Sequence, residues 1–93
     1  MEALGRETIG DGAARVIVLH DWMGDHRNYD PMVPYLDREA FTWALADLRG
    51  YGLSRDLAGR YDLREAADDV LALAARLGWS RFHLVAHSMS TLV

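Results

Sequence analysis

Three short apolar runs are spread along the chain, at residues 16–20, 41–46 and 82–86. None of them alternates cleanly between polar and apolar positions, and the first is rich in β-branched residues and too short for a helix. Short, continuously apolar runs are typical of strands in a parallel sheet that is covered on both faces. The pattern therefore predicts three buried parallel strands.

A short helix is predicted between the first two runs. Its sequence spans residues 28–36 and would turn Tyr29, Met32, Val33 and Leu36 to one side. Pro31 is tolerable in a first turn, but Pro34 should shorten or kink the helix.

A stronger helix is predicted over residues 63–77. Asp62 is suited to cap its N-terminus, with Glu65 three residues on as in a capping box, and Gly78 ends it. Apolar residues recur at three- and four-residue spacing on one face: Leu63, Ala67, Val70, Ala74 and Leu77. The charged residues of this segment should lie off that face, in water: Arg64, Glu65, Asp68, Asp69 and Arg76.

The resulting order is strand, helix, strand, helix, strand. It predicts a doubly wound α/β fold with a mostly parallel sheet between helical layers, a three-layer αβα arrangement. In such sheets the ligand crevice lies beyond the carboxyl ends of the strands. The candidate functional residues are therefore those that follow each strand: His20-Asp21-Trp22, Asp47-Leu48-Arg49-Gly50 and His87-Ser88-Met89.

Composition narrows the class of protein. The 93 residues are 51% hydrophobic and 26% charged, which excludes a disordered tail, and no stretch approaches the roughly 18 apolar residues of a membrane helix. The formal charge is −4 and the arginines are scattered, so we expect neither a nucleic-acid nor a membrane partner. The absence of cysteine and of a signal-peptide pattern favours a cytoplasmic location.

The segment around Ser88 has the layout of a nucleophile elbow. A strand ends, the serine follows, and small residues begin a helix. Ala86 and Ser90 stand where glycine is usual, and both are small enough for a sharp turn. This geometry would lift the Ser88 hydroxyl into the crevice and aim the Met89 amide at a developing oxyanion.

Three segments resemble the α/β-hydrolase family, and the resemblance covers about residues 14–93. Residues 18–22 (Val-Leu-His-Asp-Trp) resemble the family's His-Gly-aromatic segment, and residues 47–54 (Asp-Leu-Arg-Gly-Tyr-Gly-Leu-Ser) match its Asp-x-Arg-Gly-x-Gly-x-Ser loop. Residues 86–90 (Ala-His-Ser-Met-Ser) resemble its Gly-His-Ser-Met-Gly elbow. The resemblance implies a sheet with the 16–20 strand in the middle, flanked by the 41–46 and 82–86 strands.

The resemblance also implies roles for individual residues. Ser88 corresponds to the nucleophile, while the backbone amides of Met89 and Trp22 correspond to the oxyanion hole. Asp21 replaces the usual glycine, and its carboxylate would be unfavourable there unless it points away. His20 is expected to be structural, and His87 to point away from the nucleophile as a packing residue. A serine nucleophile argues against relatives that attack with aspartate, such as haloalkane dehalogenases and epoxide hydrolases.

The catalytic base and acid follow the nucleophile in this family, so we expect both beyond residue 93. Residues 1–93 would then be the N-terminal part of a single hydrolase domain, inactive alone, with the remainder of the domain as partner. No cofactor or metal is expected. Of the other polar residues, His26 is expected to be solvated, His83 to lie in a strand, and Asp47 with Arg49 to brace a loop.

Two classes of function remain open. The first is a serine hydrolase that cleaves an ester, lactone or related acyl bond of a small-molecule substrate. The second is a non-hydrolytic member of the fold, either a ligand-binding receptor or a cofactor-free oxygenase. Dinucleotide binding is excluded because the loop after the first strand, residues 20–25, is not a glycine-rich phosphate cradle.

Overall fold

The structure is a computed structural model that describes residues 3–21, 24–59 and 61–93. It contains four strands and one α-helix: β1 (Arg6–Ile9), β2 (Ala14–Leu19), β3 (Phe41–Ala46), α1 (Leu63–Arg76) and β4 (His83–Val85). Four short 3-10 turns complete the described chain: η1 (His26–Tyr29), η2 (Val33–Tyr35), η3 (Gly52–Ser54) and η4 (Ser88–Leu92).

The strands form one mixed sheet in the order β1-β3-β2-β4. β2 pairs in parallel with β3 on one side and with β4 on the other, which confirms the predicted central strand and its two neighbours. β1, which was not predicted, pairs antiparallel with β3 at the edge of the sheet. It escaped prediction because its four residues, Arg-Glu-Thr-Ile, carry only one buried apolar side chain.

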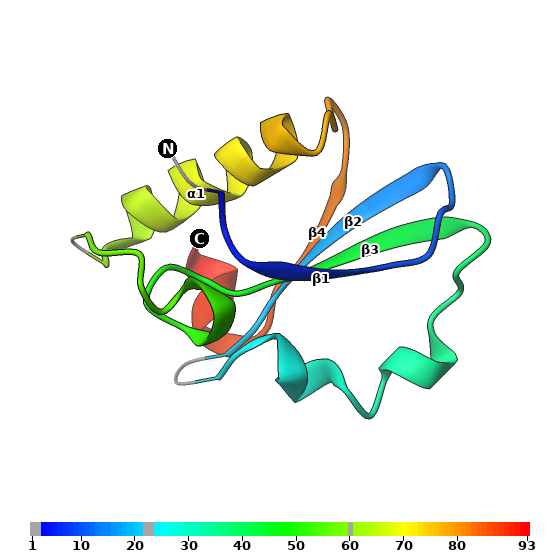
Figure 1. Ribbon diagram of the computed structural model, residues 1–93, viewed down its shortest axis with the longest axis horizontal. Coiled ribbons are helices and arrows are strands. Elements are labelled where there is room, and N and C mark those ends of the chain that lie inside the picture. Colours follow the sequence, from blue (N-terminus) through cyan, green and yellow to red (C-terminus); the bar gives the residue numbers. More distant parts are fainter. Residues whose placement is uncertain (1–2, 22–23, 60) are drawn as a thin grey trace.

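The sheet is covered on both faces, as Figure 1 shows, with α1 on one side and the chain from η1 to η2 on the other. Alternate residues of β2 supply the two cores. Ile17 and Leu19 belong to the core beneath α1, whereas Val16 and Val18 pack toward Tyr29, Val33 and Leu36. Burial on both faces explains why the strand reads as a continuous apolar run rather than an alternating one.

Helix α1 begins and ends as its sequence predicts. The Asp62 carboxylate accepts a hydrogen bond from the Glu65 amide at 2.7 Å, and Gly78 follows the helix at a φ of 75°. The helix buries Val70, Leu73 and Ala74 against the sheet. The expectation that Asp69 lies in water is wrong: it is 4% exposed because the Arg49 guanidinium binds its carboxylate with two hydrogen bonds.

The predicted helix over residues 28–36 is wrong in detail. Two separate 3-10 turns, η1 and η2, stand in its place. Pro34 lies at the start of η2 and has no amide hydrogen to donate, so a continuous α-helical ladder cannot run through it. The segment still covers its face of the sheet, because Tyr29, Val33 and Leu36 pack against that core.

The core beneath α1 gives a stability prediction. Leu73 is fully buried, so replacing it with alanine should lower the free energy of unfolding of the protein that carries this chain by about 2–5 kcal/mol. Leu71 lies on the same helix but is 62% exposed, so Leu71→Ala should change it by no more than about 0.5 kcal/mol. Denaturant unfolding of both variants measures the difference, and equal effects would contradict the assigned packing of α1.

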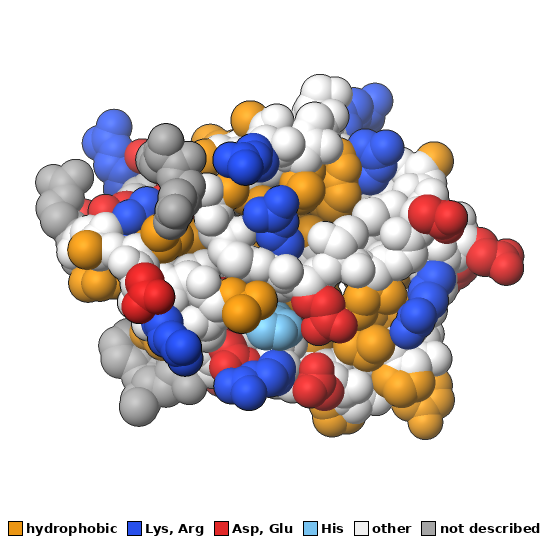
Figure 2. Space-filling model, viewed as in Figure 1, with side chains coloured by type: hydrophobic (Ala, Val, Ile, Leu, Met, Phe, Trp, Pro, Cys, Tyr) orange, Lys and Arg blue, Asp and Glu red, His pale blue; other side chains and the backbone are white. Residues whose placement is uncertain are grey.

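Charged groups are interspersed on the face seen in Figure 2, with no gathering of one sign. In the part of the chain that the structure describes, no helix combines the length and apolar character needed to cross a bilayer.

Candidate active site at the carboxyl edge of the sheet

The residues that follow β2, β3 and β4 lie at the same edge of the sheet. Leu19 of β2 is in register with Ala46 of β3, and Val18 of β2 is in register with Val85 of β4. Because these strands are parallel, the residues after them emerge side by side. The candidate segments beginning at His20, Asp47 and Ala86 therefore meet where the sequence predicts a crevice.

His20 is a buried residue that joins two of these segments. Its Nε2 accepts a hydrogen bond from the Leu48 amide at 3.0 Å, so that nitrogen is unprotonated. The other ring nitrogen, Nδ1, then carries the proton and donates it to the Asp21 carbonyl at 2.8 Å. With both nitrogens occupied, the neutral ring supports the loop and has no free lone pair with which to act as a base.

Asp47 is the centre of a second set of contacts. Its carboxylate is fully buried and accepts the main-chain N–H of His26 at 2.6 Å and that of Leu53 at 2.8 Å. The Ser54 hydroxyl donates to the Asp47 carbonyl at 2.7 Å and accepts from the Gly5 amide at the same distance. These contacts explain why aspartate and serine stand at the two ends of the 47–54 motif.

Gly52 allows this motif to close. Its φ is 46°, and a Cβ added to it would lie 2.6 Å from the nearest Asp47 carboxylate oxygen. Glycine alone combines that backbone conformation with such a close approach.

The expectation that His26 is solvated is wrong. Its side chain is only 12% exposed, and its Nδ1 lies 2.8 Å from Oδ2 of Asp47. An ionised carboxylate only accepts hydrogen bonds, so Nδ1 is the donor. Nothing in the local sequence signals this contact, since 21 residues separate the two partners.

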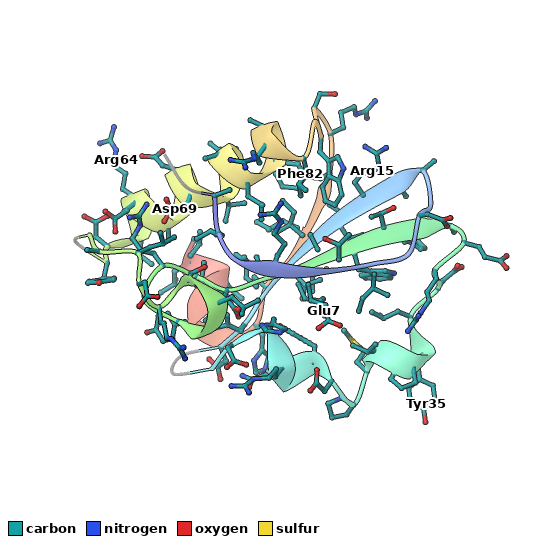
Figure 3. The ribbon with its side chains drawn as sticks, in the orientation of Figure 1. Glu7, Arg15, Tyr35, Arg64, Asp69 and Phe82 are labelled. Carbon is teal, nitrogen blue, oxygen red and sulfur yellow. The ribbon has the colours of Figure 1, made fainter. Side chains whose placement is uncertain are left out.

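Asp47 and Arg49 brace loops, but not as the pair that the sequence suggested. Asp47 binds His26 and Leu53, whereas Arg49 binds Asp69 of α1 and the Ala58 carbonyl. Hydrogen bonding to Asp69 raises the pKa of the Arg49 guanidinium. Figure 3 labels Asp69 on α1, on the side toward this loop.

The backbone changes conformation between His87 and Ser88. His87 is extended, with φ −132° and ψ 128°, and Ser88 begins the 3-10 turn η4 directly after it. Ser90 is small enough for the turn and also stabilises it, because its buried hydroxyl accepts a hydrogen bond from the His87 amide at 2.9 Å. The Ser90 hydroxyl also lies 3.0 Å from the His87 carbonyl and 3.4 Å from the Leu19 carbonyl, which connects the elbow to the end of β2.

Asp21 and His87 face each other across the ends of β2 and β4. Oδ2 of Asp21 lies 3.7 Å from Nδ1 of His87, whose side chain is 68% exposed. His87 is therefore a surface residue and not the packing residue that the sequence suggested. The Asp21 carboxylate is thus directed toward the imidazole of His87.

Trp22, the other candidate oxyanion donor, lies outside the described residues. The chain on either side of it is well tied down. The Asp21 carbonyl accepts hydrogen bonds from His20 and, at 3.1 Å, from the Gly24 amide. The Tyr29 hydroxyl donates to the Leu19 carbonyl at 2.6 Å, and burial raises the pKa of this phenol.

A metal ion has one candidate site among the described residues, formed by Asp25, His26 and Asp47, whose ligand atoms lie within 4.8 Å of one another. The donors are already used within the protein. Nδ1 of His26 carries the proton that it donates to Asp47, and the Asp25 carboxylate binds the Arg27 guanidinium, which lowers the pKa of Asp25. This cluster is a hydrogen-bonded junction rather than an open set of ligands.

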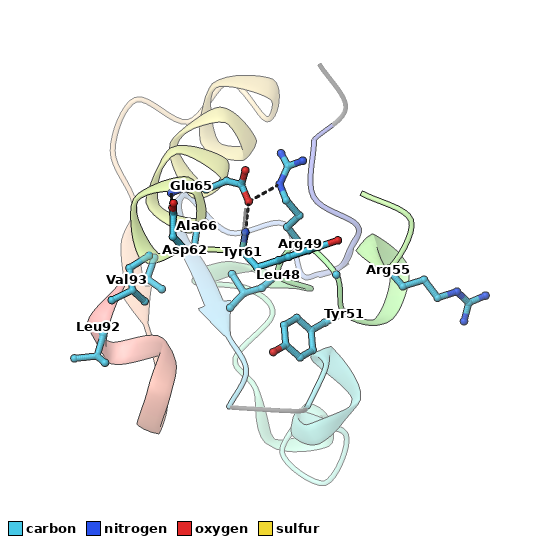
Figure 4. A pocket seen from close by; sticks show the side chains of 12 residues that line it. Leu48, Arg49, Tyr51, Arg55, Tyr61, Asp62, Glu65, Ala66, Leu92 and Val93 are labelled. Carbon is cyan, nitrogen blue, oxygen red and sulfur yellow. Dashed lines mark hydrogen bonds and ion pairs between the residues drawn. The ribbon is translucent and has the colours of Figure 1, made fainter. Parts of the chain in front are cut away.

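A hollow of about 770 Å³ lies beside the site, shown in Figure 4. Its walls come from the 48–55 loop, the start of α1 and the end of the chain, including Arg49, Tyr51, Glu65, Leu92 and Val93. Three of the candidate residues that follow β3 line it, namely Leu48, Arg49 and Gly50. The hollow therefore lies between the loop after β3, the start of α1 and the end of the chain.

Comparisons with known proteins agree with the sequence motifs. Residues 14–93 match the family model described as alpha/beta hydrolase fold. The chain is 36% identical over 90 residues to a pimeloyl-[acyl-carrier protein] methyl ester esterase of Klebsiella pneumoniae, covering 92% of the chain and 34% of the relative. It is also 36% identical over 72 residues to a 2-heptyl-3-hydroxy-4(1H)-quinolone dioxygenase of Mycobacteroides abscessus, covering 77% of the chain and 26% of the relative.

A solved structure gives the same result for the fold. A hypothetical protein from Pseudomonas aeruginosa PAO1 superposes with a TM-score of 0.82 at 33% identity. The match covers 94% of this chain and 31% of that protein. The chain thus spans about a third or less of the length of these three proteins.

Proposed function

Because the chain belongs to the α/β-hydrolase family, we propose that the protein carrying it is a serine hydrolase that cleaves an ester, lactone or related acyl bond. The observation that supports this most is the place of Ser88. It stands first in the turn after β4, at the sheet edge that also holds His20 and Asp47. A relative named as a methyl ester esterase agrees with acyl chemistry.

In the proposed mechanism a general base takes the proton of the Ser88 hydroxyl as its oxygen attacks the acyl carbon and forms a tetrahedral intermediate. The backbone amides of Met89 and Trp22 donate hydrogen bonds to its oxyanion, a contribution that is often the largest in such enzymes. Collapse of the intermediate expels the alcohol, whose oxygen takes the proton back from the base, and water then hydrolyses the acyl-serine to release the acid and regenerate the Ser88 hydroxyl. His20, Asp21 and His87 support or line the site.

The base and the acid of this mechanism are proposed to lie beyond Val93, in the remainder of the same domain. His20 and His26 support that division of roles. The ring nitrogens of His20 are both occupied, and Nδ1 of His26 is bound to Asp47. Residues 1–93 would then contribute the nucleophile and the oxyanion amides, with a small molecule as substrate.

Labelling with a fluorophosphonate tests the proposal, because this probe reacts with serine hydroxyls activated by a base. The intact protein should be labelled at Ser88, and peptide fragmentation must place the adduct on Ser88 and not on Ser90. Heat-denatured protein is the control and should not react. Absence of labelling, together with no hydrolysis of short esters or lactones, would contradict a serine hydrolase.

A second candidate is the non-hydrolytic class, either a cofactor-free oxygenase or a ligand-binding receptor. It is favoured by the relative named as a quinolone dioxygenase and by Asp21, which stands where glycine is usual. Oxygen uptake with a heteroaromatic substrate, by protein that does not react with the fluorophosphonate, would support the oxygenase. Ligand binding without turnover would support the receptor.

A further inference from the structure

The segment between β2 and η1 is fastened at both ends to two consecutive residues. At its start, Nε2 of His20 accepts the Leu48 amide at 3.0 Å. At its end, His26 donates both its main-chain N–H and its Nδ1–H to the Asp47 carboxylate, at 2.6 and 2.8 Å. Two histidines six positions apart thus hold the two ends of one loop.

The second attachment is made to a rigid point. Asp47 directly follows β3, its carboxylate is fully buried, and its own amide donates to the Gly5 carbonyl at 2.8 Å. The Leu53 amide binds the same carboxylate from the other side. The hydrogen bond from the His26 ring therefore fixes the end of the loop relative to the edge of the sheet.

The first attachment reaches the Asp21 carbonyl. That carbonyl accepts hydrogen bonds from Nδ1 of His20 at 2.8 Å and from the Gly24 amide at 3.1 Å. The residue that follows, Trp22, is the proposed oxyanion donor, and the chain must then return to η1. Because a displacement of about 1 Å in a positioning contact can cost about 100-fold in rate, the second attachment bears directly on catalysis.

We propose that His26 is a positioning residue for the oxyanion hole, acting through its Nδ1 hydrogen bond to Asp47. The inference rests on the proposed function, since it assumes that Ser88 attacks and that the Trp22 amide binds the oxyanion. His26 itself touches no reacting atom in this mechanism. Its other ring nitrogen, Nε2, lies 3.7 Å from Glu7, a partly exposed side chain of β1 that Figure 3 labels.

Two amide substitutions of the intact protein isolate the Nδ1 contact. In His26→Asn the side-chain NH₂ takes nearly the place of Nδ1, so the bond to Asp47 is kept. In His26→Gln the same group lies one methylene farther out, so the bond is displaced while polarity is retained. With p-nitrophenyl acetate, kcat per fluorophosphonate-titrated site should fall about 10- to 100-fold in His26→Gln. It should stay within about threefold of the wild type in His26→Asn.

The KM of the ester should change little in either variant, because the oxyanion contact forms fully only in the transition state. A trifluoromethyl ketone, which binds as a tetrahedral adduct of serine, should lose affinity in His26→Gln in parallel with kcat. Glu7→Gln is the matched control: it alters the group beside Nε2, leaves the Asp47 contact intact, and should keep wild-type kcat.

The outcomes separate this inference from the proposed function. Wild-type protein that neither reacts with the fluorophosphonate nor hydrolyses the ester overturns both. Wild-type activity with equal kcat in His26→Asn and His26→Gln overturns only the positioning role. Loss of folding in both variants also overturns it, because His26 would then be needed for the fold itself and not for the oxyanion contact.

Discussion

Replacing Ser88 with alanine in the intact protein is expected to lower kcat for ester hydrolysis by roughly 10⁴- to 10⁶-fold. The substitution removes the attacking oxygen but leaves the oxyanion amides, which belong to the backbone. A residual rate about 10³-fold above the uncatalysed reaction is therefore compatible with the proposal. Steady-state kinetics with an activated ester and with a lactone measure the loss.

Ser80→Ala is the matched control for this substitution. Ser80 is an exposed residue in the turn between α1 and β4, so its loss should leave kcat and KM unchanged. Circular dichroism of both variants should match the wild type, because both changes remove only a hydroxyl. An unaltered rate in Ser88→Ala would remove the serine mechanism and favour the oxygenase or the receptor.

The architecture could be predicted because its signals are local and agree with one another. β2 and β3 read as apolar runs since both faces of each strand are buried, and α1 carries its cap at Asp62 and its stop at Gly78. β1 could not be predicted in the same way. Its pairing with β3 is a main-chain interaction between segments more than thirty residues apart, and its side chains carry little of the core.

The sequence motifs predicted which segments form the candidate site, but not all of the contacts between them. The sequence brought forward the segments after β2, β3 and β4, and the parallel register places them at one edge. The sequence did not show that His26 would be hydrogen-bonded to Asp47, or that Asp69 would be buried in contact with Arg49. Both are contacts between charged or polar groups some twenty residues apart, for which no periodicity exists to be read.

The buried Asp47 carboxylate joins the loops that follow β2 and β3. Asp47→Ala should lower the free energy of unfolding by about 3–5 kcal/mol, because it leaves the His26 and Leu53 donors without their acceptor in a buried place. Activity should fall as well, since the substitution also releases the loop that carries the proposed oxyanion donor. Denaturant unfolding and ester hydrolysis by the intact variant measure the two effects.

A surface carboxylate with similar bonds provides the comparison. Asp37 accepts the amides of Glu39 and Ala40 at 3.0 and 2.9 Å, but it is exposed, so water can replace it. Asp37→Ala should therefore cost no more than about 1 kcal/mol and leave the rate of hydrolysis unchanged. If the two substitutions were equally mild, the Asp47 carboxylate would not be holding the loops after β2 and β3 together, and the support assigned to His26 would lose its basis.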